Sequence, residues 1–366
     1  MNAFTAGNPM QHCARAKIYA LAISTVVTLA AAEVLLRACH YHRYGIPFSF
    51  SEYSRCDPVL GWRGKLVSEG ASPRAPRIFV LGDSFTQGVG VPEEKLYYTV
   101  LGRALGAGIS AYSASGYGTL QEYLALDRYL DRVKPDLIIL QVCYNDFINN
   151  SWDLERASYF NNNLLIRPYW VHGRIEYRFP RRAGGVRVFL ASHSRLCSVL
   201  ITRLEKARAL LAQNGILHSV EGPMARGMEY PDFARSVSVT EELIGKIKRR
   251  AGATHVIAFP VDLHPPCFEQ FSRIFGREKI PFIDEVPLRI REEERRGTVL
   301  KLPDGAHYNE AGHRICGEVL AEAILKNGYL VRRPPAATVR DTYGVLCYPP
   351  TPCLPAGRLP LKGEGE

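Results

Sequence analysis

A run of apolar residues that stops at a glycine constrains the fold of this chain more than any other feature. Residues 78–81 are Ile-Phe-Val-Leu, and Gly82, Asp83 and Ser84 follow directly. Four consecutive apolar residues of β-branched and aromatic type predict a short buried strand. Ser84 then lies just past the carboxyl end of that strand, where open α/β sheets bind their ligands. A serine that only caps the next helix fits the same residues, because Ser and Asp are favoured caps.

Strand and helix patterns alternate along the chain after this first strand. Residues 137–142 are almost entirely apolar and predict the best buried strand, and weaker strand patterns cover 108–113, 254–259 and 280–283. The helical patterns lie at 96–105, 120–133, 194–213, 240–250, 271–275, 289–296 and 311–326. Strands that alternate with helices favour a mostly parallel sheet with right-handed crossovers.

Asp304 and His307 lie three residues apart on a loop flanked by proline and glycine, just before a helical pattern. A serine nucleophile needs a base that removes its proton, and the base needs a carboxylate that orients its ring and stabilises the imidazolium. An Asp-x-x-His loop supplies both groups. His313 lies six residues further on, but the Asp-x-x-His spacing favours His307 as the base.

Four segments together resemble the sequence blocks of the SGNH/GDSL hydrolase family of serine esterases. Residues 82–84, Gly-Asp-Ser, resemble the first block, which carries the nucleophile. Ser115-Gly116-Tyr117-Gly118 resembles the second block, whose glycine lends a backbone N–H to the oxyanion hole. Asn145-Asp146 resembles the third, whose Asn side chain is another oxyanion donor, and residues 304–307 resemble the last, with the acid and the base.

This resemblance implies a flavodoxin-like, three-layer α/β/α sandwich and a serine esterase that uses no cofactor and no metal. It assigns Ser84, Asp304 and His307 to catalysis, and the Ser84 N–H, Gly116 and Asn145 to the oxyanion hole. A plain tight turn is the alternative at Gly116, since glycine permits positive φ.

The chain departs from the family pattern at two supporting positions. Cys143 stands where the third block usually has Gly, and Ala111 stands where the second block usually begins with Asn. These departures bear on rate and geometry more than on the class of reaction.

Three functions suit these residues. The first is an esterase that acts on a small-molecule or carbohydrate acyl ester, such as an O-acetyl ester. The second is an O-acyltransferase that uses the same serine on an envelope carbohydrate, and the third is a non-catalytic carbohydrate-binding scaffold. The choice between the first two depends on whether water or a hydroxyl accepts the acyl group.

Residues 149–190 interrupt the alternating pattern with asparagines, aromatic residues and arginines. Such an insertion could line a substrate groove or form a lid, and it could equally be a surface excursion with its own small cluster. A strong helix is predicted after it, with Leu196, Leu200, Leu204 and Leu211 at helical spacing.

The amino-terminal region predicts a membrane anchor. Residues 18–36 are mostly apolar and uncharged apart from Glu33, and a spanning helix needs about 20 residues with a lower limit near 17. Glu33 lies near one end, where a carboxylate can reach the interface. A cleavable signal peptide is the rival interpretation, because small residues lie at 30–32. We expect one uncleaved span, with the catalytic domain on the extracytoplasmic side.

Charge and cysteine content exclude other classes of site. The net charge of +10 is scattered, and no nucleic-acid-binding motif accompanies it, which favours a solvated surface over a nucleic acid partner. The nine cysteines include no CxxC pair, so a metal framework is not expected. Cys347 and Cys353 flank a proline-rich turn and could pair in an oxidising compartment.

The sequence thus divides into five parts. They are a cytoplasmic segment (1–17), a transmembrane anchor (18–37), a connector (38–75), a catalytic domain (76–330) with an insertion at about 149–190, and a proline-rich tail (331–366).

Overall fold

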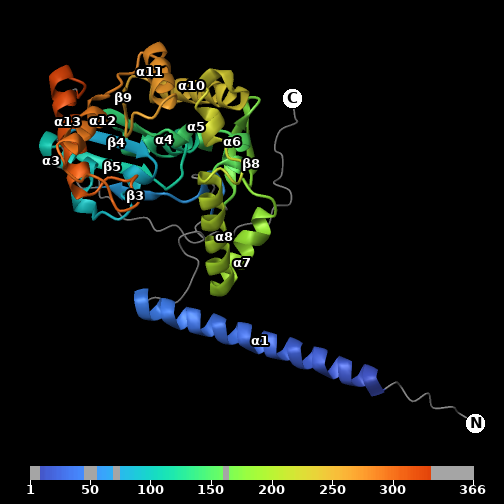
Figure 1. The fold of residues 1–366 in the computed structure, drawn as a ribbon. Helices are drawn as coiled ribbons and strands as arrows, with labels where there is room; N and C mark the ends of the chain where they lie inside the picture. Colours follow the sequence, from blue (N-terminus) through green and yellow to red (C-terminus); the bar gives the residue numbers. More distant parts are fainter. Residues whose placement is uncertain (1–8, 45–55, 69–74, 160–164, 331–366) are drawn as a thin grey trace, which may run out of the picture.

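The computed structural model of the chain describes residues 9–44, 56–68, 75–159 and 165–330. In this described part, a five-stranded sheet runs in the order β3-β5-β4-β6-β9 (Figure 1). Neighbouring strands from β5 to β9 are parallel, and β3 pairs antiparallel with β5 at one edge. The strands are β3 (Lys65–Ser68), β4 (Arg77–Gly82), β5 (Gly108–Ser113), β6 (Leu137–Val142) and β9 (His255–Pro260). The predicted mostly parallel sheet is confirmed.

The central strand β4 is buried on both faces. Ile78 and Val80 point into one apolar cluster, and Phe79 and Leu81 point into another on the opposite face of the sheet. A strand buried on both faces carries a continuous apolar run rather than an alternating one. The apolar run at residues 78–81 therefore marks the centre of the sheet.

Helices cover both faces of the sheet and complete three layers (Figure 1). One face packs against apolar side chains of α3 (Tyr97–Leu105), α12 (Glu285–Arg295) and α13 (Glu310–Asn327). The other face packs against α4 (Thr119–Val133), α10 (Pro231–Ala251) and α11 (Cys267–Arg277). The predicted three-layer α/β/α sandwich is confirmed.

The region predicted as a connector contains ordered structure. It holds the short pair β1 (Cys56–Asp57) and β2 (Gly61–Trp62) as well as the sheet strand β3. The Trp62 ring is buried, and Trp62 O accepts a hydrogen bond from Tyr117 Oη at 2.6 Å. These residues therefore pack onto the three-layer domain. By contrast, the predicted strand at 280–283 is reduced to one bridge, between Ala258 and Phe282.

The insertion carries its own hairpin and helices. Its elements are α6 (Trp152–Ala157), β7 (Arg167–Val171), β8 (Arg174–Arg178) and most of α7 (Gly184–His193), and the helix predicted after it is α8 (Arg195–Gln213). An ion pair between Arg167 and Glu155 at 2.6 Å joins the hairpin to α6, and Arg167 also donates to Gln121 of α4 at 2.5 Å. The remaining elements are α1 (Pro9–Tyr44), α2 (Ser84–Gln87), η1 (Glu93–Lys95), α5 (Asn145–Asn149), α9 (Glu221–Met224) and η2 (Gly227–Glu229).

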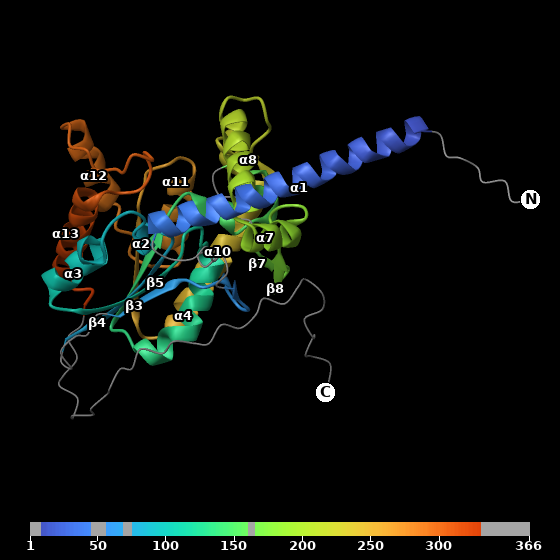
Figure 2. The same cartoon turned by 90° about the horizontal axis from the view of Figure 1, so that it is seen from below.

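The long helix α1 lies outside the three layers. Figures 1 and 2 show it crossing one side of the domain, next to α7 and α8. It includes one 28-residue stretch, Arg15–His42, that is long and apolar enough to cross a membrane or to act as a signal sequence. The proline-rich tail, with Cys347 and Cys353, lies outside the described residues.

Candidate active site

Ser84 is the first residue of the short helix α2, directly after β4. Asp83 caps this helix, because its Oδ1 accepts a hydrogen bond from Phe85 N at 3.0 Å. Gly88 ends the helix with a φ of 73°, a left-handed conformation that glycine adopts without strain. The strand therefore delivers a half-buried serine to the carboxyl edge of the sheet.

A loop that is held by its own aspartate carries His307. Asp304 Oδ1 accepts hydrogen bonds from Ala306 N at 2.9 Å and from His307 N at 3.0 Å. Leu302 N donates to His307 O at 2.8 Å and closes the loop. These contacts fix the backbone on which the imidazole sits.

The side chains of Ser84, His307 and Asp304 form one chain of hydrogen bonds. His307 Nε2 lies 2.8 Å from Ser84 Oγ, and His307 Nδ1 lies 2.6 Å from Asp304 Oδ2. A hydrogen on Nδ1 that is donated to the carboxylate leaves Nε2 free to accept the serine hydrogen. Two groups 223 residues apart in sequence therefore meet at one edge of the sheet.

The electrostatics keep Asp304 in its charged form. Burial raises the pKa of this carboxyl, but hydrogen bonds from Ala306 and His307, together with the imidazole charge, outweigh burial and hold its pKa below the ordinary value. A carboxylate that stays ionised can stabilise the positive imidazolium that forms when His307 takes a proton.

Gly116 lies on the loop after β5, which α2 holds in place. Gln87 Oε1, on α2, accepts hydrogen bonds from Ser115 N at 2.6 Å and from Ser115 Oγ at 2.7 Å. Gly116 has a φ of 75° and is partly exposed. Its N–H has no internal acceptor in the described part of the chain. The loop is thus tied to the helix that Ser84 begins, with one N–H open to a ligand.

Asn145 begins α5, directly beyond β6, and is buried. Its Nδ2 donates to Asp83 Oδ2 at 3.3 Å and to Asn149 Oδ1 at 3.0 Å. The Asn149 amide is better satisfied in the opposite orientation, where its oxygen accepts from Arg167 at 3.2 Å. In that orientation one hydrogen of Asn145 is released. The structure places Asn145 against the residue before Ser84, without a direct contact to the serine hydroxyl.

Gln141 is a supporting residue that the sequence analysis missed. Its Oε1 accepts hydrogen bonds from Asp83 N at 3.1 Å, Thr86 N at 3.3 Å and Thr86 Oγ1 at 2.9 Å. A Cβ added at Gly82 would collide with Thr86 Oγ1 and Gln141 Oε1, so the strand must end in glycine here. A glutamine inside an otherwise apolar strand is the signal that could have revealed it, since buried polar groups need partners.

Buried carboxyl groups lie beneath this site. Burial raises the pKa of Asp83, Glu122 and Asp146, and the neighbouring acids raise it further for Glu122 and Asp146. Asp146 Oδ2 accepts a hydrogen bond from Cys143 N at 3.0 Å and so braces the turn that carries Asn145. The carboxyl groups beneath the site are therefore harder to ionise than exposed carboxyl groups.

Two other histidines, His313 and His264, do not contact Ser84 in the described part of the chain. His313 is buried against Tyr97, and burial together with the nearby His307 lowers the pKa of His313 to about 4. His264 is exposed and stacks on the ring of Tyr144, with 4.9 Å between ring centres. His307 is the histidine that the structure brings to the serine.

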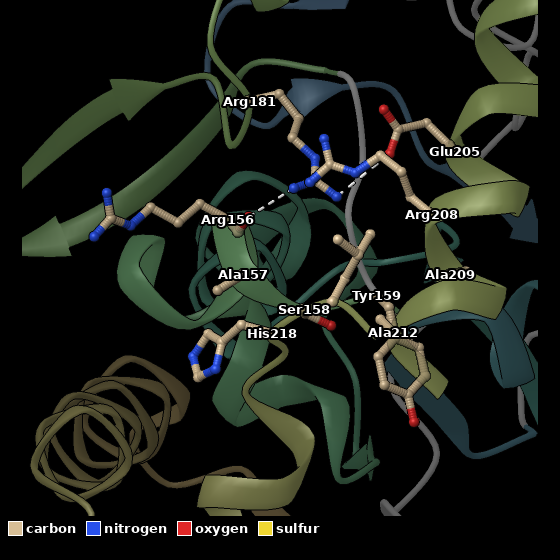
Figure 3. A pocket seen from close by; sticks show the side chains of 11 residues that line it. Arg156, Ala157, Ser158, Tyr159, Arg181, Glu205, Arg208, Ala209, Ala212 and His218 are labelled. Atoms are coloured by element: carbon tan, nitrogen blue, oxygen red, sulfur yellow. Dashed lines mark hydrogen bonds and ion pairs between the residues drawn. The ribbon is translucent and has the colours of Figure 1, made fainter. Parts of the chain in front are cut away.

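Figure 3 shows a pocket of about 280 Å³ that lies apart from these residues. Residues of α6 and α8 line it, including Arg156, Arg208 and Glu205, whereas Ser84, Asp304 and His307 do not. Arg181 crosses the pocket wall and donates to Arg156 O at 2.8 Å and to Glu205 Oε2 at 3.3 Å. No group of acids, histidines and cysteines suited to a metal ion occurs among the described residues.

Comparison with known proteins gives one family match. Residues 80–315, well over half of the chain, match the model of the GDSL-like lipase/acylhydrolase family. No curated protein matched the chain. The matched range contains Ser84, Gly116, Asn145, Asp304 and His307.

Solved structures are also similar, at low identity. The lipase/acylhydrolase from Enterococcus faecalis is 13% identical, with 71% of this chain and 100% of that chain covered and a TM-score of 0.39. The family 3 carbohydrate esterase of Clostridium thermocellum is 14% identical, with 69% and 96% covered and a TM-score of 0.36. The psychrotrophic esterase EstA from Pseudoalteromonas sp. is 12% identical, with 68% and 97% covered and a TM-score of 0.36.

Proposed function

The chain belongs to the GDSL-like lipase/acylhydrolase family, and from that premise we propose that it is a membrane-anchored serine hydrolase of acyl esters. The observation that supports this most is the hydrogen-bond chain from Ser84 through His307 to Asp304. The proposed substrate is a small-molecule or carbohydrate carboxylic ester, with an O-acetyl ester as the first candidate.

In the proposed acylation step, Ser84 Oγ attacks the ester carbonyl carbon while His307 Nε2 removes the serine proton. The oxyanion that forms is held by the backbone N–H groups of Ser84 and Gly116 and by the Asn145 amide. The first N–H groups of a helix have no intrahelical acceptor, so the Ser84 N–H at the start of α2 is available for this. The C–O bond to the alcohol then breaks, and His307 gives its proton to the departing oxygen.

In the proposed deacylation step, water takes the place of the alcohol. His307 removes a proton from the water, the hydroxide attacks the acyl carbon, and the bond to Ser84 Oγ breaks as His307 returns its proton to the serine. Asp304 stays charged throughout and stabilises the imidazolium in both steps. Acid and alcohol are the products, and the enzyme returns to its starting state.

The proposed anchor is residues 18–37, within α1. A 28-residue apolar stretch spans about 42 Å as a helix, enough for a hydrocarbon core of about 30 Å. We assign residues 1–17 to the cytoplasm, 76–330 to the extracytoplasmic catalytic domain and 331–366 to a tail. Residues 38–75 join anchor and domain, with β3 contributed to the sheet. A signal peptide is the rival, and the length of the mature chain from membranes separates the two.

A fluorophosphonate probe tests the proposed nucleophile. The full chain should be labelled on Ser84, and Ser84→Ala should lose both labelling and ester hydrolysis while it keeps the fold. Labelling that persists in Ser84→Ala would contradict the proposal. A panel of p-nitrophenyl esters then ranks the acyl chains. Incubation with an acetyl donor and an oligosaccharide distinguishes hydrolysis, which releases acetate, from transfer, which acetylates the sugar.

A further inference from the structure

The outer face of α8 carries an apolar stripe that the domain does not cover. Leu200, Leu204 and Leu211 are 52%, 61% and 39% exposed, and Ala207 is exposed between them. Their spacing of four, three and four residues places them on one side of a helix. The opposite side faces the protein, where Ser198 is buried. An apolar helix face normally packs against a core, so the exposed stripe needs an occupant.

Helix α7 directly precedes α8 and packs against it, and we call the pair the α7–α8 hairpin. This hairpin exposes a second apolar patch on α7. Val186, Phe189 and Leu190 are all exposed, and the Phe189 ring lies 4.3 Å from the His193 ring, centre to centre. We call these three residues, with Leu200, Leu204 and Leu211, the hairpin apolar surface. Figure 1 shows α7 and α8 as the part of the domain that extends toward α1.

Cations border this surface. On a helix of 3.6 residues per turn, Arg203 and Arg208 fall on opposite flanks of the stripe, and Lys206 lies further round. All three are exposed, and none forms an ion pair with a described residue. Glu205, on the inner side of α8, is already engaged by Arg181 and Arg187. Apolar side chains with flanking basic residues are the pattern of a helix that lies in an anionic membrane interface.

The turn between α7 and α8 is hydrogen-bonded to α1. Glu33 accepts hydrogen bonds from Arg195 N at 2.8 Å, Leu196 N at 2.8 Å and Ser194 Oγ at 2.9 Å. Arg37 pairs with Glu33 at 2.6 Å and donates to His193 O at 2.6 Å. The one acid inside the apolar helix therefore satisfies the first N–H groups of α8.

The contact with Glu33 determines how deep in the membrane α8 begins. Glu33 lies three residues before Leu36, where the apolar run ends, which is about 4.5 Å along a helix. An α8 that begins beside Glu33 thus begins at the edge of the hydrocarbon layer. Figures 1 and 2 both show α8 crossing the direction of α1, so α8 runs along a membrane that α1 crosses.

We propose that the α7–α8 hairpin docks on the anionic lipid surface around the anchor, with the hairpin apolar surface in the interface and the flanking cations on lipid headgroups. The inference rests on the anchor of the proposed function. The contact with α1 and the cations beside the stripe favour lipid over a second copy of the chain, since facing copies would bring like charges together.

Photoactivatable phospholipids test this with the full chain in vesicles. The probe lipid is added to phosphatidylcholine vesicles, with or without about 30% phosphatidylglycerol, and labelled peptides are mapped by mass spectrometry. We expect labels on residues 18–36 and also on residues 186–211, and the ratio of hairpin to anchor labelling should rise when phosphatidylglycerol is present. The anchor peptide serves as the internal reference.

Variants sharpen this test. Leu200→Glu with Leu204→Glu should lower the hairpin ratio roughly tenfold. The matched control is Leu288→Glu with Leu325→Glu, on exposed positions of α12 and α13, which should leave the ratio unchanged. Replacing Arg203, Lys206 and Arg208 with Gln should remove the gain from phosphatidylglycerol. Fluorophosphonate labelling of each variant in detergent checks that the catalytic domain is folded.

Three other labelling results would each lead to a different conclusion. An anchor that is labelled beside an unlabelled hairpin overturns the docking surface and leaves the anchor standing. An unlabelled anchor overturns both, while Ser84 labelling still decides the hydrolase. Hairpin cross-links between two copies overturn the lipid assignment in favour of a dimer.

Discussion

The two halves of the candidate site are held in different ways. The serine side is buried: Asp83, Thr86 and Gln141 are each no more than 1% exposed, and the hydrogen bonds of Gln141 fix the turn before and after Ser84. The histidine side is an open loop, where Asp304 is 44% exposed and holds the backbone of His307 itself. Changes on the serine side should therefore affect stability and chemistry together, whereas changes on the loop should separate them.

The largest expected effect is on the open loop. His307→Ala should lower kcat/KM by about 10⁴-fold, because the proposed base is lost while the binding groups remain. Its midpoint of thermal unfolding should stay within about 2 °C of wild type, since the side chain is partly exposed. Steady-state kinetics and calorimetry measure both. A loss of activity that is matched by a loss of stability would break the comparison.

Asn145→Ala comes next and probes the boundary between the two halves. Removal of one oxyanion donor typically costs about 10²–10³-fold in kcat. The effect should fall on kcat with little change in KM, because the contact strengthens in the transition state. Unchanged turnover would remove Asn145 from the oxyanion role. Asn149→Ala is a control on the neighbouring amide, with a smaller expected loss.

His313 gives a pH-dependent test on the buried side. Its pKa is about 4 in the folded chain and 6.5 in the ordinary state, so the unfolded chain binds more protons between these values. Stability from the neutral imidazole is present above pH 6.5 and is lost as the pH falls toward 4, by on the order of 3 kcal/mol. His313→Asn should flatten this loss in chemical unfolding at pH 7, 6, 5 and 4. An unchanged slope would contradict the assignment.

The smallest expected effect on catalysis is at Gln141. Gln141→Met keeps the volume but removes the acceptor of three hydrogen bonds, and should cost about 1–3 kcal/mol of unfolding free energy. A displaced serine should also lower kcat, roughly tenfold. Unfolding in urea and kinetics on one p-nitrophenyl ester measure both. A variant that loses activity but keeps its unfolding free energy would show that the serine side is not rigidly coupled to the core.

Much of the sheet and of the site could be predicted from local sequence. The strands β4 and β6 are buried on both faces of the sheet, so each appears in the sequence as a nearly continuous apolar run that is easy to recognise. The Asp-x-x-His loop holds its own geometry, so both groups lie in one short pattern, which the Gly-Asp-Ser, Ser-Gly-Tyr-Gly and Asn-Asp segments made interpretable. The strand β3 escaped notice because an edge strand with one buried residue, Val67, has no comparable signal.

The helix α8 shows what periodicity does not specify. Its leucines have the spacing that α4 also shows, where Leu120 and Leu124 are buried. In α8 the leucines face outward, because the inner side is occupied by Ser198 and the ion pairs of Glu205. Spacing identifies a helix, whereas the direction of its apolar face depends on contacts with distant segments. Gln141 was missed for the same reason, since its partners come from β4 and α2.

Trapping of the acyl-enzyme tests whether Ser84 is the nucleophile and His307 its base. The wild-type chain is mixed with an activated ester, quenched in acid within the first turnover, and digested for mass spectrometry. We expect one acyl group on the peptide that contains Ser84, and none on that peptide in His307→Ala. Turnover with the acyl group on another residue, or undiminished hydrolysis by Ser84→Ala, would contradict it.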